Sequence, residues 1–174
     1  YSVCAALLAF ALGGCSTTSH YSKQHDSSNQ ITKAAVAKMQ RAARHGDVTA
    51  QYTLGQMYFQ GSSVLNRNDK QAYHWMQAAA KQGNTAAERA LGFLYFNGVG
   101  TKTNLKQGFH WTTLAAKAGD AKAMYNLSMA YERGHGTTVS KKMAGQWLTR
   151  SANTHNTKAQ VQLAKHYLKG SLGF

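Results

Sequence analysis

The chain has 174 residues, and its 20 lysines and arginines outnumber its 6 acidic residues, which gives a formal net charge of +14. It has no proline, so the strongest helix breaker is absent. Both cysteines, Cys4 and Cys15, lie near the start, and the absence of cysteine from residues 16–174 excludes a disulfide or a cysteine-ligated metal site there.

The first 14 residues form an apolar segment in front of a cysteine. Residues 3–12 are apolar without interruption, but this run is shorter than the about 20 residues that a membrane-spanning helix needs. The run ends in Leu-Gly-Gly-Cys, with the cysteine at Cys15. This resembles a bacterial lipoprotein signal, in which the cysteine thiol takes a diacylglyceryl group, whereas a short buried helix is the alternative. Such signals open with Met and basic residues, so we expect the natural start to lie upstream of Tyr1.

Residues 15–30 form a polar segment, which we expect to act as a flexible tether. Its central part, STTSHYSKQHDSSN, has no hydrophobic periodicity and no large aliphatic residue, a composition typical of a coil. Ser16 follows the cysteine, and in the enterobacterial sorting pattern this residue favours delivery to the outer membrane. The lipoprotein resemblance therefore implies a place in the bacterial cell envelope, on an outer-membrane anchor that faces the periplasm.

The remaining part of the chain, residues 31–174, repeats itself. Three tryptophans stand 36 residues apart, and tyrosine and glycine columns recur in step with them. A period in this range with several matching columns predicts stacked helical units rather than one globular core. The columns are Trp75, Trp111 and Trp147; Tyr58, Tyr95 and Tyr131; and Gly61, Gly98 and Gly134.

Each unit contains a first predicted helix with a helical spacing of small and apolar residues. In the first unit these are Ala50, Leu54 and Tyr58, and Gly61 ends the helix because glycine adopts a left-handed cap without steric cost. The units are expected at about 50–86, 87–122 and 123–158, followed by a partial unit at 159–174.

A second predicted helix follows in each unit after a loop. Asn68, Asn104 and Ser140 end the three loops, and their side chains can accept hydrogen bonds from the free amides of a starting helix. Glycine closes this helix in the first two units, but His155 holds that place in the third, so we expect a weaker cap there.

Half-units flank the three complete ones. Residues 31–45 match the second helix of a degenerate preceding unit, and residues 158–169 match a first helix whose partner helix the sequence does not contain. A first helix without its partner exposes Leu163 and Tyr167. We therefore expect that either the natural protein runs further or another surface covers this end.

This pattern resembles the Sel-one-like repeat, a relative of the tetratricopeptide repeat. The resemblance rests on Ala-x3-Leu-Gly-x2-Tyr-x2-Gly, which starts at Ala50, and on Ala-x2-Trp-x3-Ala-Ala-x2-Gly, which starts at Ala72. It implies an all-α fold, a right-handed α-solenoid of about three and a half repeats. It also implies a role in holding other proteins, usually without catalysis, and gives no reason to expect a cofactor.

A stripe of the first helices lies opposite the Leu and Tyr columns, at roughly 100° per residue. In tetratricopeptide proteins the corresponding columns line the concave groove, and aromatic, Met and Arg side chains are the usual anchors of peptide-binding surfaces. The alternative is that the phenylalanines pack between repeats. The residues predicted to line a partner-binding groove are Tyr52, Gln56, Phe59, Arg89, Phe93, Phe96, Tyr125, Met129, Glu132 and Arg133.

The excess positive charge has two interpretations, a solvated outer face or attraction to anionic partners such as lipids, wall polymers or an acidic protein. Nucleic acid fits the charge equally well, but the sequence has no nucleic-acid-binding motif. The eight histidines form no HExxH motif, so we expect no metal site.

Acidic residues are too few to favour an enzyme. Glu88 and Glu132 are the only acids in the first helices, and they hold different columns. We therefore favour a non-catalytic protein–protein interaction scaffold that binds a protein or peptide and is anchored in the envelope through Cys15. The alternatives are a hydrolase that acts on wall material and a basic adhesin that binds anionic envelope polymers.

Overall fold

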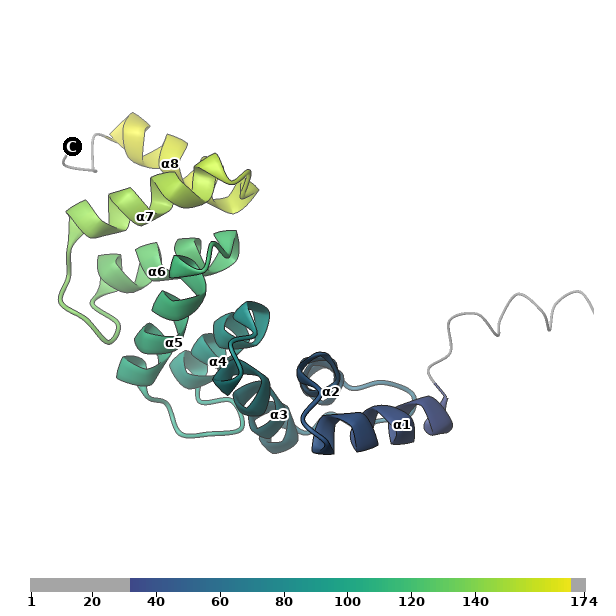
Figure 1. Cartoon of the computed structure of the whole chain (residues 1–174). Coiled ribbons are helices and arrows are strands. Elements are labelled where there is room, and N and C mark those ends of the chain that lie inside the picture. The colour runs from purple at the N-terminus through teal and green to yellow at the C-terminus, as the bar shows by residue number, and fades with distance from the viewer. Residues whose placement is uncertain (1–31, 170–174) are drawn as a thin grey trace, which may run out of the picture. The chain divides into compact units, whose positions relative to one another are not determined.

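The computed structural model of the chain describes residues 32–169, which contain eight helices and no strand. The helices are α1 (Lys33–Arg44), α2 (Val48–Gln60), α3 (Asp69–Lys81), α4 (Thr85–Asn97), α5 (Leu105–Lys117), α6 (Ala121–Arg133), α7 (Lys141–Asn153) and α8 (Thr157–Lys169) (Figure 1). The predicted all-α class is confirmed. The predicted signal segment, Cys15 and the predicted tether lie outside the described residues.

Consecutive helices pack against each other from α1 to α8 (Figure 1). Longer loops join α2 to α3, α4 to α5 and α6 to α7, whereas short turns join these helix pairs to one another. The extra residue of the first unit lies in the loop 61–68, so it leaves the packed helices in register. The result is the stacked arrangement of an α-solenoid. None of the helices in residues 32–169 is long and apolar enough to span a bilayer.

Side chains cap the helix starts as the sequence predicts. At Asn68 and Asn104 the side-chain oxygen accepts a hydrogen bond of 3.0 Å from the amide three residues on, and at Ser140 the corresponding bond is 3.3 Å. Because the first amides of a helix have no partner within it, each bond satisfies a group that would otherwise need water. The three predicted caps are confirmed.

The first helix of each unit ends at a glycine with positive φ. Gly98 and Gly134 are in the left-handed region with φ of 67° and 72°, and Gly61 has φ of 76°. The second helices of the first two units are followed by Gly83 and Gly119, with φ of 81° and 97°. Glycine has no Cβ and adopts these angles without steric cost.

His155 holds the place of these glycines after the third pair, and its φ is 60°. Among residues 32–169 it is the only residue other than glycine with a positive φ. A Cβ in this region approaches the neighbouring backbone, so the turn is strained compared with its glycine equivalents. This agrees with the weaker cap that the sequence predicts at this position.

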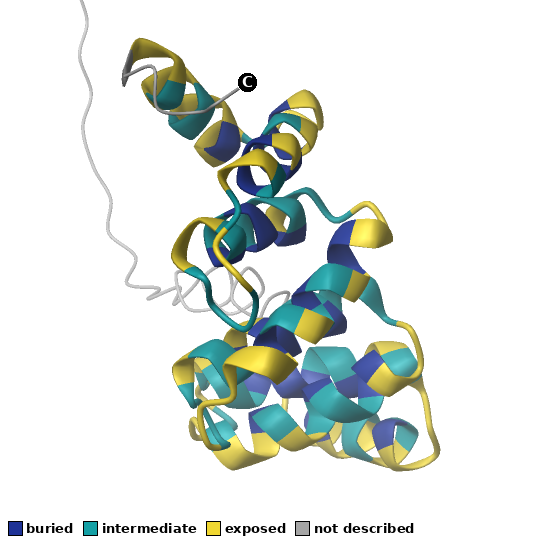
Figure 2. Ribbon diagram, turned by 90° about the vertical axis from the view of Figure 1, so that its left-hand side faces the viewer, coloured by how far each residue is buried: buried dark blue, intermediate teal, exposed yellow. Residues whose placement is uncertain are grey.

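The core consists of small clusters between successive helix pairs, which Figure 2 shows as a buried line along the stack. Leu54, Leu91 and Leu127 are completely buried at equivalent positions. Trp111 packs against the cluster of α3 and α4, and Trp147 belongs to the cluster of α5, α6 and α7. These two indoles therefore join one helix pair to the preceding one.

Two loop glycines lie against the preceding unit. A Cβ on Gly100 would overlap the carbonyl oxygen of Asp69 at the start of α3, and a Cβ on Gly136 would overlap that of Leu105 at the start of α5. Backbone atoms cannot give way as a flexible side chain can, so only glycine fits at these contacts. Each of these loops is thereby held against the preceding helix pair.

Candidate partner-binding groove

Residues of α4 and α6, and of the loop that follows α6, line a hollow of about 330 Å³. Five of the ten predicted groove residues lie in its lining: Phe93, Phe96, Tyr125, Met129 and Arg133. We call this site the apolar hollow, after its aromatic and Met side chains, although polar side chains form a comparable part of the lining. Asn126 and His135 also line it, and the sequence did not point to either of them. The repeat register thus brings together the aromatic and Met side chains that were expected to act as anchors.

Phe93 is the most prominent member of the apolar hollow. Its side chain is 45% exposed, although it stands beside completely buried positions of α4. The ring of Phe59 from α2 meets it edge to face, with 6.1 Å between the centroids, and the guanidinium of Arg67 lies 5.7 Å from the centroid of Phe59. Aromatic surface therefore continues from the apolar hollow to α2.

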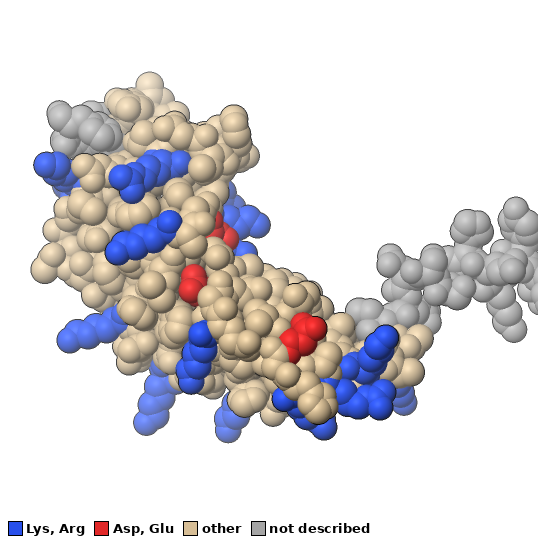
Figure 3. Space-filling view, viewed as in Figure 1, with Lys and Arg blue, Asp and Glu red and all other residues tan. Residues whose placement is uncertain are grey.

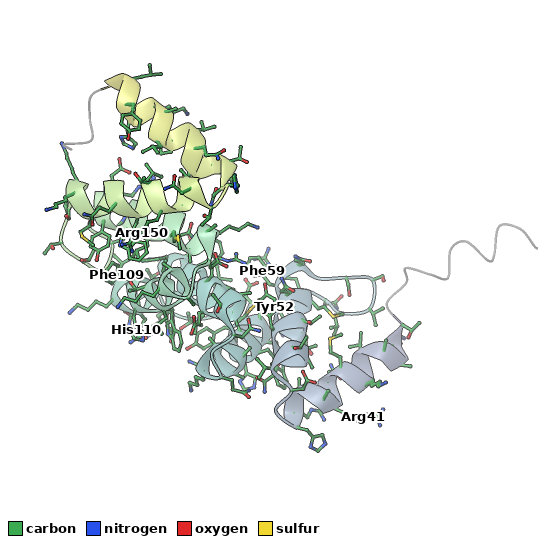
Figure 4. The ribbon with its side chains drawn as sticks, turned by 45° about the horizontal axis from the view of Figure 1, so that its top comes forward. Arg41, Tyr52, Phe59, Phe109, His110 and Arg150 are labelled. Atoms are coloured by element: carbon green, nitrogen blue, oxygen red, sulfur yellow. The ribbon has the colours of Figure 1, made fainter. Side chains whose placement is uncertain are left out.

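Tyr52 and Phe59 lie on the side of α2 that faces the next unit (Figure 4). The amide nitrogen of Gln56 donates a hydrogen bond of 2.9 Å to the hydroxyl of Tyr52, whose ring packs on the cluster of α3 and α4. Both side chains are half-buried. Tyr52 therefore contributes to packing as well as to the surface.

Two predicted anchors of the apolar hollow also belong to the packing between helices. Tyr125 packs against the cluster of Leu148, Ala152 and Ala159. The ring of Phe96 lies so close to Gly108 of α5 that a Cβ there would overlap it. The alternative that the phenylalanines pack between repeats therefore applies in part to Phe96, and also to the contact of Phe59 with Phe93. Because Phe93 is nevertheless exposed, Phe93 and Met129 are the cleaner probes of binding.

A second hollow, of about 610 Å³, adjoins the first, because Tyr125 and Asn126 line both. Its remaining polar lining comes mainly from the starts of α6 and α8 and from the turn before α8. We call it the cationic hollow, after its four basic side chains. These are Arg89, Lys122, His155 and Lys158.

One of these basic side chains, that of Arg89, is compensated within the protein. The Arg89 Nε atom donates a hydrogen bond of 3.0 Å to Asp120 Oδ2, with the two side chains 27% and 18% exposed. Lys122 and Lys158 are exposed, and neither forms an ion pair with another of the described residues. The sequence carried a signal for this pair, since the two lysines hold the same position in successive units.

The last predicted groove residue, Glu132, lies on the other side of α6, in a hollow of about 520 Å³ that α8 helps to line. Met129 lines this hollow as well as the apolar one. Glu132 Oε1 stands 3.9 Å from His166 Nε2 of α8. The structure therefore places Glu132 in a different hollow from Phe93.

The two acids of the first helices have different surroundings. Glu88 is 8% exposed, and burial raises the pKa of its carboxyl while the charge of His110 acts in the opposite direction. Glu132 faces His166 instead. No group of three His, Cys, Asp or Glu residues within residues 32–169 has an arrangement that could hold a metal ion.

Comparison with known proteins agrees with this architecture. The family model described as the Sel1 repeat matches residues 48–84, 85–120, 121–153 and 157–173. None of the curated proteins matches the chain.

Solved structures show the same similarity. A Sel1 repeat protein from Oxalobacter formigenes is 33% identical, with a TM-score of 0.66 over 75% of this chain and 97% of that one. The protective antigen c5321 of uropathogenic Escherichia coli, with an SLR fold, is 32% identical and has a TM-score of 0.74. That match covers 78% of this chain but 29% of the antigen. Helicobacter pylori cysteine rich protein B (hcpB), 19% identical with a TM-score of 0.58 over 74% and 96% of the two chains, shares the fold.

Proposed function

Because this chain belongs to the Sel1 repeat family, whose fold is typical of protein–protein interaction scaffolds, we propose that it binds a segment of a partner protein without catalysing a reaction. The binding site is the groove that the first helices line, with the apolar hollow at its centre. The observation that supports this most directly is the exposure of Phe93 beside Phe59, Tyr125 and Met129. Aromatic and Met side chains of this kind are frequent anchors at protein interfaces.

Single exposed apolar residues are common on protein surfaces and need no explanation. The apolar hollow differs, because the exposed Phe93 shares one depression with other aromatic and Met side chains and with Arg133. Specific protein interfaces likewise combine apolar side chains with polar ones around them. This favours a partner segment that inserts an apolar side chain.

The proposal extends to the location of the protein. The resemblance of its first 15 residues to a lipoprotein signal supports a lipid anchor on Cys15, in the outer membrane, with the repeats facing the periplasm. Growth of a bacterial host with an alkyne fatty acid should label the chain, and Cys15→Ser should abolish the label. Equal labelling of both proteins would rule out the anchor.

Affinity capture at high salt from the native membrane tests the groove itself. We expect Phe93→Ala combined with Met129→Ala to reduce the captured partner at least tenfold. The matched control is Leu114→Ala, which truncates an exposed apolar residue of α5 outside the lining of the apolar hollow. Undiminished capture by the double variant would contradict the groove. Tyr125 and Arg89 are less suitable, because both also hold the fold together.

Affinity capture, combined with an assay of wall hydrolysis, also separates the scaffold from the hydrolase and the basic adhesin. Substitution of Glu88 and Glu132 should leave capture intact in a scaffold and abolish the activity of a wall hydrolase. A basic adhesin would lose its ligand at moderate salt whatever happens at Phe93, because exposed charges are screened over about 8–10 Å. Figure 3 shows Lys and Arg at many separate places on the visible face, the distribution on which the adhesin alternative depends.

A further inference from the structure

We infer that the partner segment combines an apolar anchor with an acidic residue, so that the ligand is an acidic-apolar linear peptide. This inference rests on the proposed function and adds the chemistry of the ligand. It comes from the neighbourhood of the two hollows, because Tyr125 and Asn126 form part of both linings. A segment that places an apolar side chain in one hollow passes the other.

The charge of the cationic hollow is largely uncompensated. Arg89 is neutralised by Asp120, but Lys122 and Lys158 remain without an acidic partner among residues 32–169. The other acids in this part of the chain are engaged elsewhere: Asp47 caps α2, Asp69 pairs with Arg67, Glu88 is buried and Glu132 faces α8. A carboxylate from outside would therefore meet two lysines with little competition.

The turn that carries His155 is held against the start of α6. Both the Ser151 hydroxyl and the Asn156 amide donate hydrogen bonds to the Ala121 carbonyl oxygen, at 2.6 Å and 3.1 Å. His155 and Lys122 adjoin these groups in sequence, so the hydrogen bonds hold the backbone of the two residues together on one side of the cationic hollow. This is also the one short turn among the described residues where a side chain replaces glycine at positive φ.

The geometry of the helices limits the spacing of the two ligand groups. Lys122 of the cationic hollow and Met129 of the apolar hollow are seven residues apart on α6, which is about 10 Å along the axis at about 1.5 Å per residue. An extended peptide advances about 3.3 Å per residue and directs alternate side chains to the same side. An acidic residue two to four positions from the apolar anchor spans about 7–13 Å, a range that includes this separation.

Selection of twelve-residue peptides from a displayed library against the full chain, at about 0.15 M salt, tests this inference. We expect the enriched peptides to share an apolar or aromatic residue with Asp or Glu two to four positions away. Enrichment of basic peptides, or of apolar peptides without an acidic residue, would overturn it.

Charge reversal at the site provides the second arm. Lys122→Glu with Lys158→Glu should weaken an enriched, fluorescein-labelled acidic-apolar peptide at least tenfold and favour its Lys-substituted analogue. The matched control is Lys70→Glu with Lys106→Glu, two exposed lysines 36 residues apart on second helices, which should change affinity less than twofold. Circular dichroism of each variant verifies that it is folded.

Phe93→Ser separates the contribution of the apolar hollow to binding from that of the cationic hollow. If it abolishes peptide binding while reversal at Lys122 and Lys158 does nothing, the groove stands and the acidic preference is wrong. If neither change matters, the proposed groove fails as well. Polyglutamate that competes equally well for the wild type and for Phe93→Ser would assign the site to anionic polymers and overturn the inference.

Discussion

Glu88 holds in α4 the position from which Gln51 in α2 donates a hydrogen bond to the preceding helix. The Gln51 Nε2 atom lies 3.0 Å from the carbonyl oxygen of Ala43, eight residues back. Gln160 in α8 repeats the contact with Ala152, also eight residues back, at 3.3 Å. A glutamate can donate such a bond only when it is protonated, and burial raises the pKa of Glu88 while the charge of His110 opposes that shift.

We therefore expect Glu88→Gln to stabilise the protein by about 1 kcal/mol at pH 7, the net contribution of one intramolecular hydrogen bond. A raised folded-state pKa means that the contribution of Glu88 is fully present below its ordinary value of 4.5. That contribution is lost as the pH rises through the raised pKa. Urea unfolding at several pH values should thus show a stability difference that shrinks on acidification.

The matched control for this prediction is Gln51→Glu, which places a carboxyl at the equivalent position of α2. It should destabilise the protein at pH 7 and regain stability as the pH falls. A pH-independent effect of either substitution would show that the carboxyl does not take the part of the glutamine amide.

His155→Gly should raise the free energy of unfolding by about 1 kcal/mol, because it removes a side chain from a left-handed turn. The reverse change, Gly83→His, should cost a similar amount, since its φ is 81° and a Cβ there would meet nothing within 4 Å. Thermal unfolding measures both. Because His155 lines the cationic hollow, the same substitution should weaken binding of an acidic-apolar peptide while it stabilises the fold. A gain in both stability and affinity would contradict the role of His155 in that hollow.

Gly92→Ala should destabilise the protein by about 1–3 kcal/mol, the usual cost of overpacking a core. The added methyl would overlap the Thr112 hydroxyl, which is buried and has no hydrogen-bond partner. Thr112→Ala removes that atom, so the double variant should be more stable than the sum of the two single changes predicts. A strictly additive double-mutant cycle, measured by urea unfolding, would show that another contact limits the space.

Asp120 has two functions that substitution can separate. One of its oxygens caps α6 at the Ala123 amide, 2.7 Å away, and the other binds Arg89. Asp120→Asn keeps the cap and should cost less than Asp120→Ala, which we expect to lose about 1–2 kcal/mol. Equal losses in denaturant unfolding would mean that the ion pair carries the whole effect.

The sequence predicted those features that depend on neighbours within one helix pair. The caps at Asn68, Asn104 and Ser140 are local hydrogen bonds between a side chain and an amide three residues on, so spacing suffices to find them. The predicted columns at Leu54 and Leu91 are buried because the helical period places them on the inner side.

Features that depend on how successive helix pairs pack against each other were harder to predict from the sequence. The stripe at Phe93 and Met129 was found from periodicity, but the packing of Tyr125 against α7 and α8 was not, since the next unit determines it. His135 comes from a loop, whose path no helical period describes. The role of the predicted groove residues in binding stays a prediction.

Gly100 and Gly136 contact the unit before their own, and the helices contact chiefly their nearest neighbours. Pulling the protein from its ends would therefore release it one hairpin at a time, and the force would show a sawtooth instead of a single rupture.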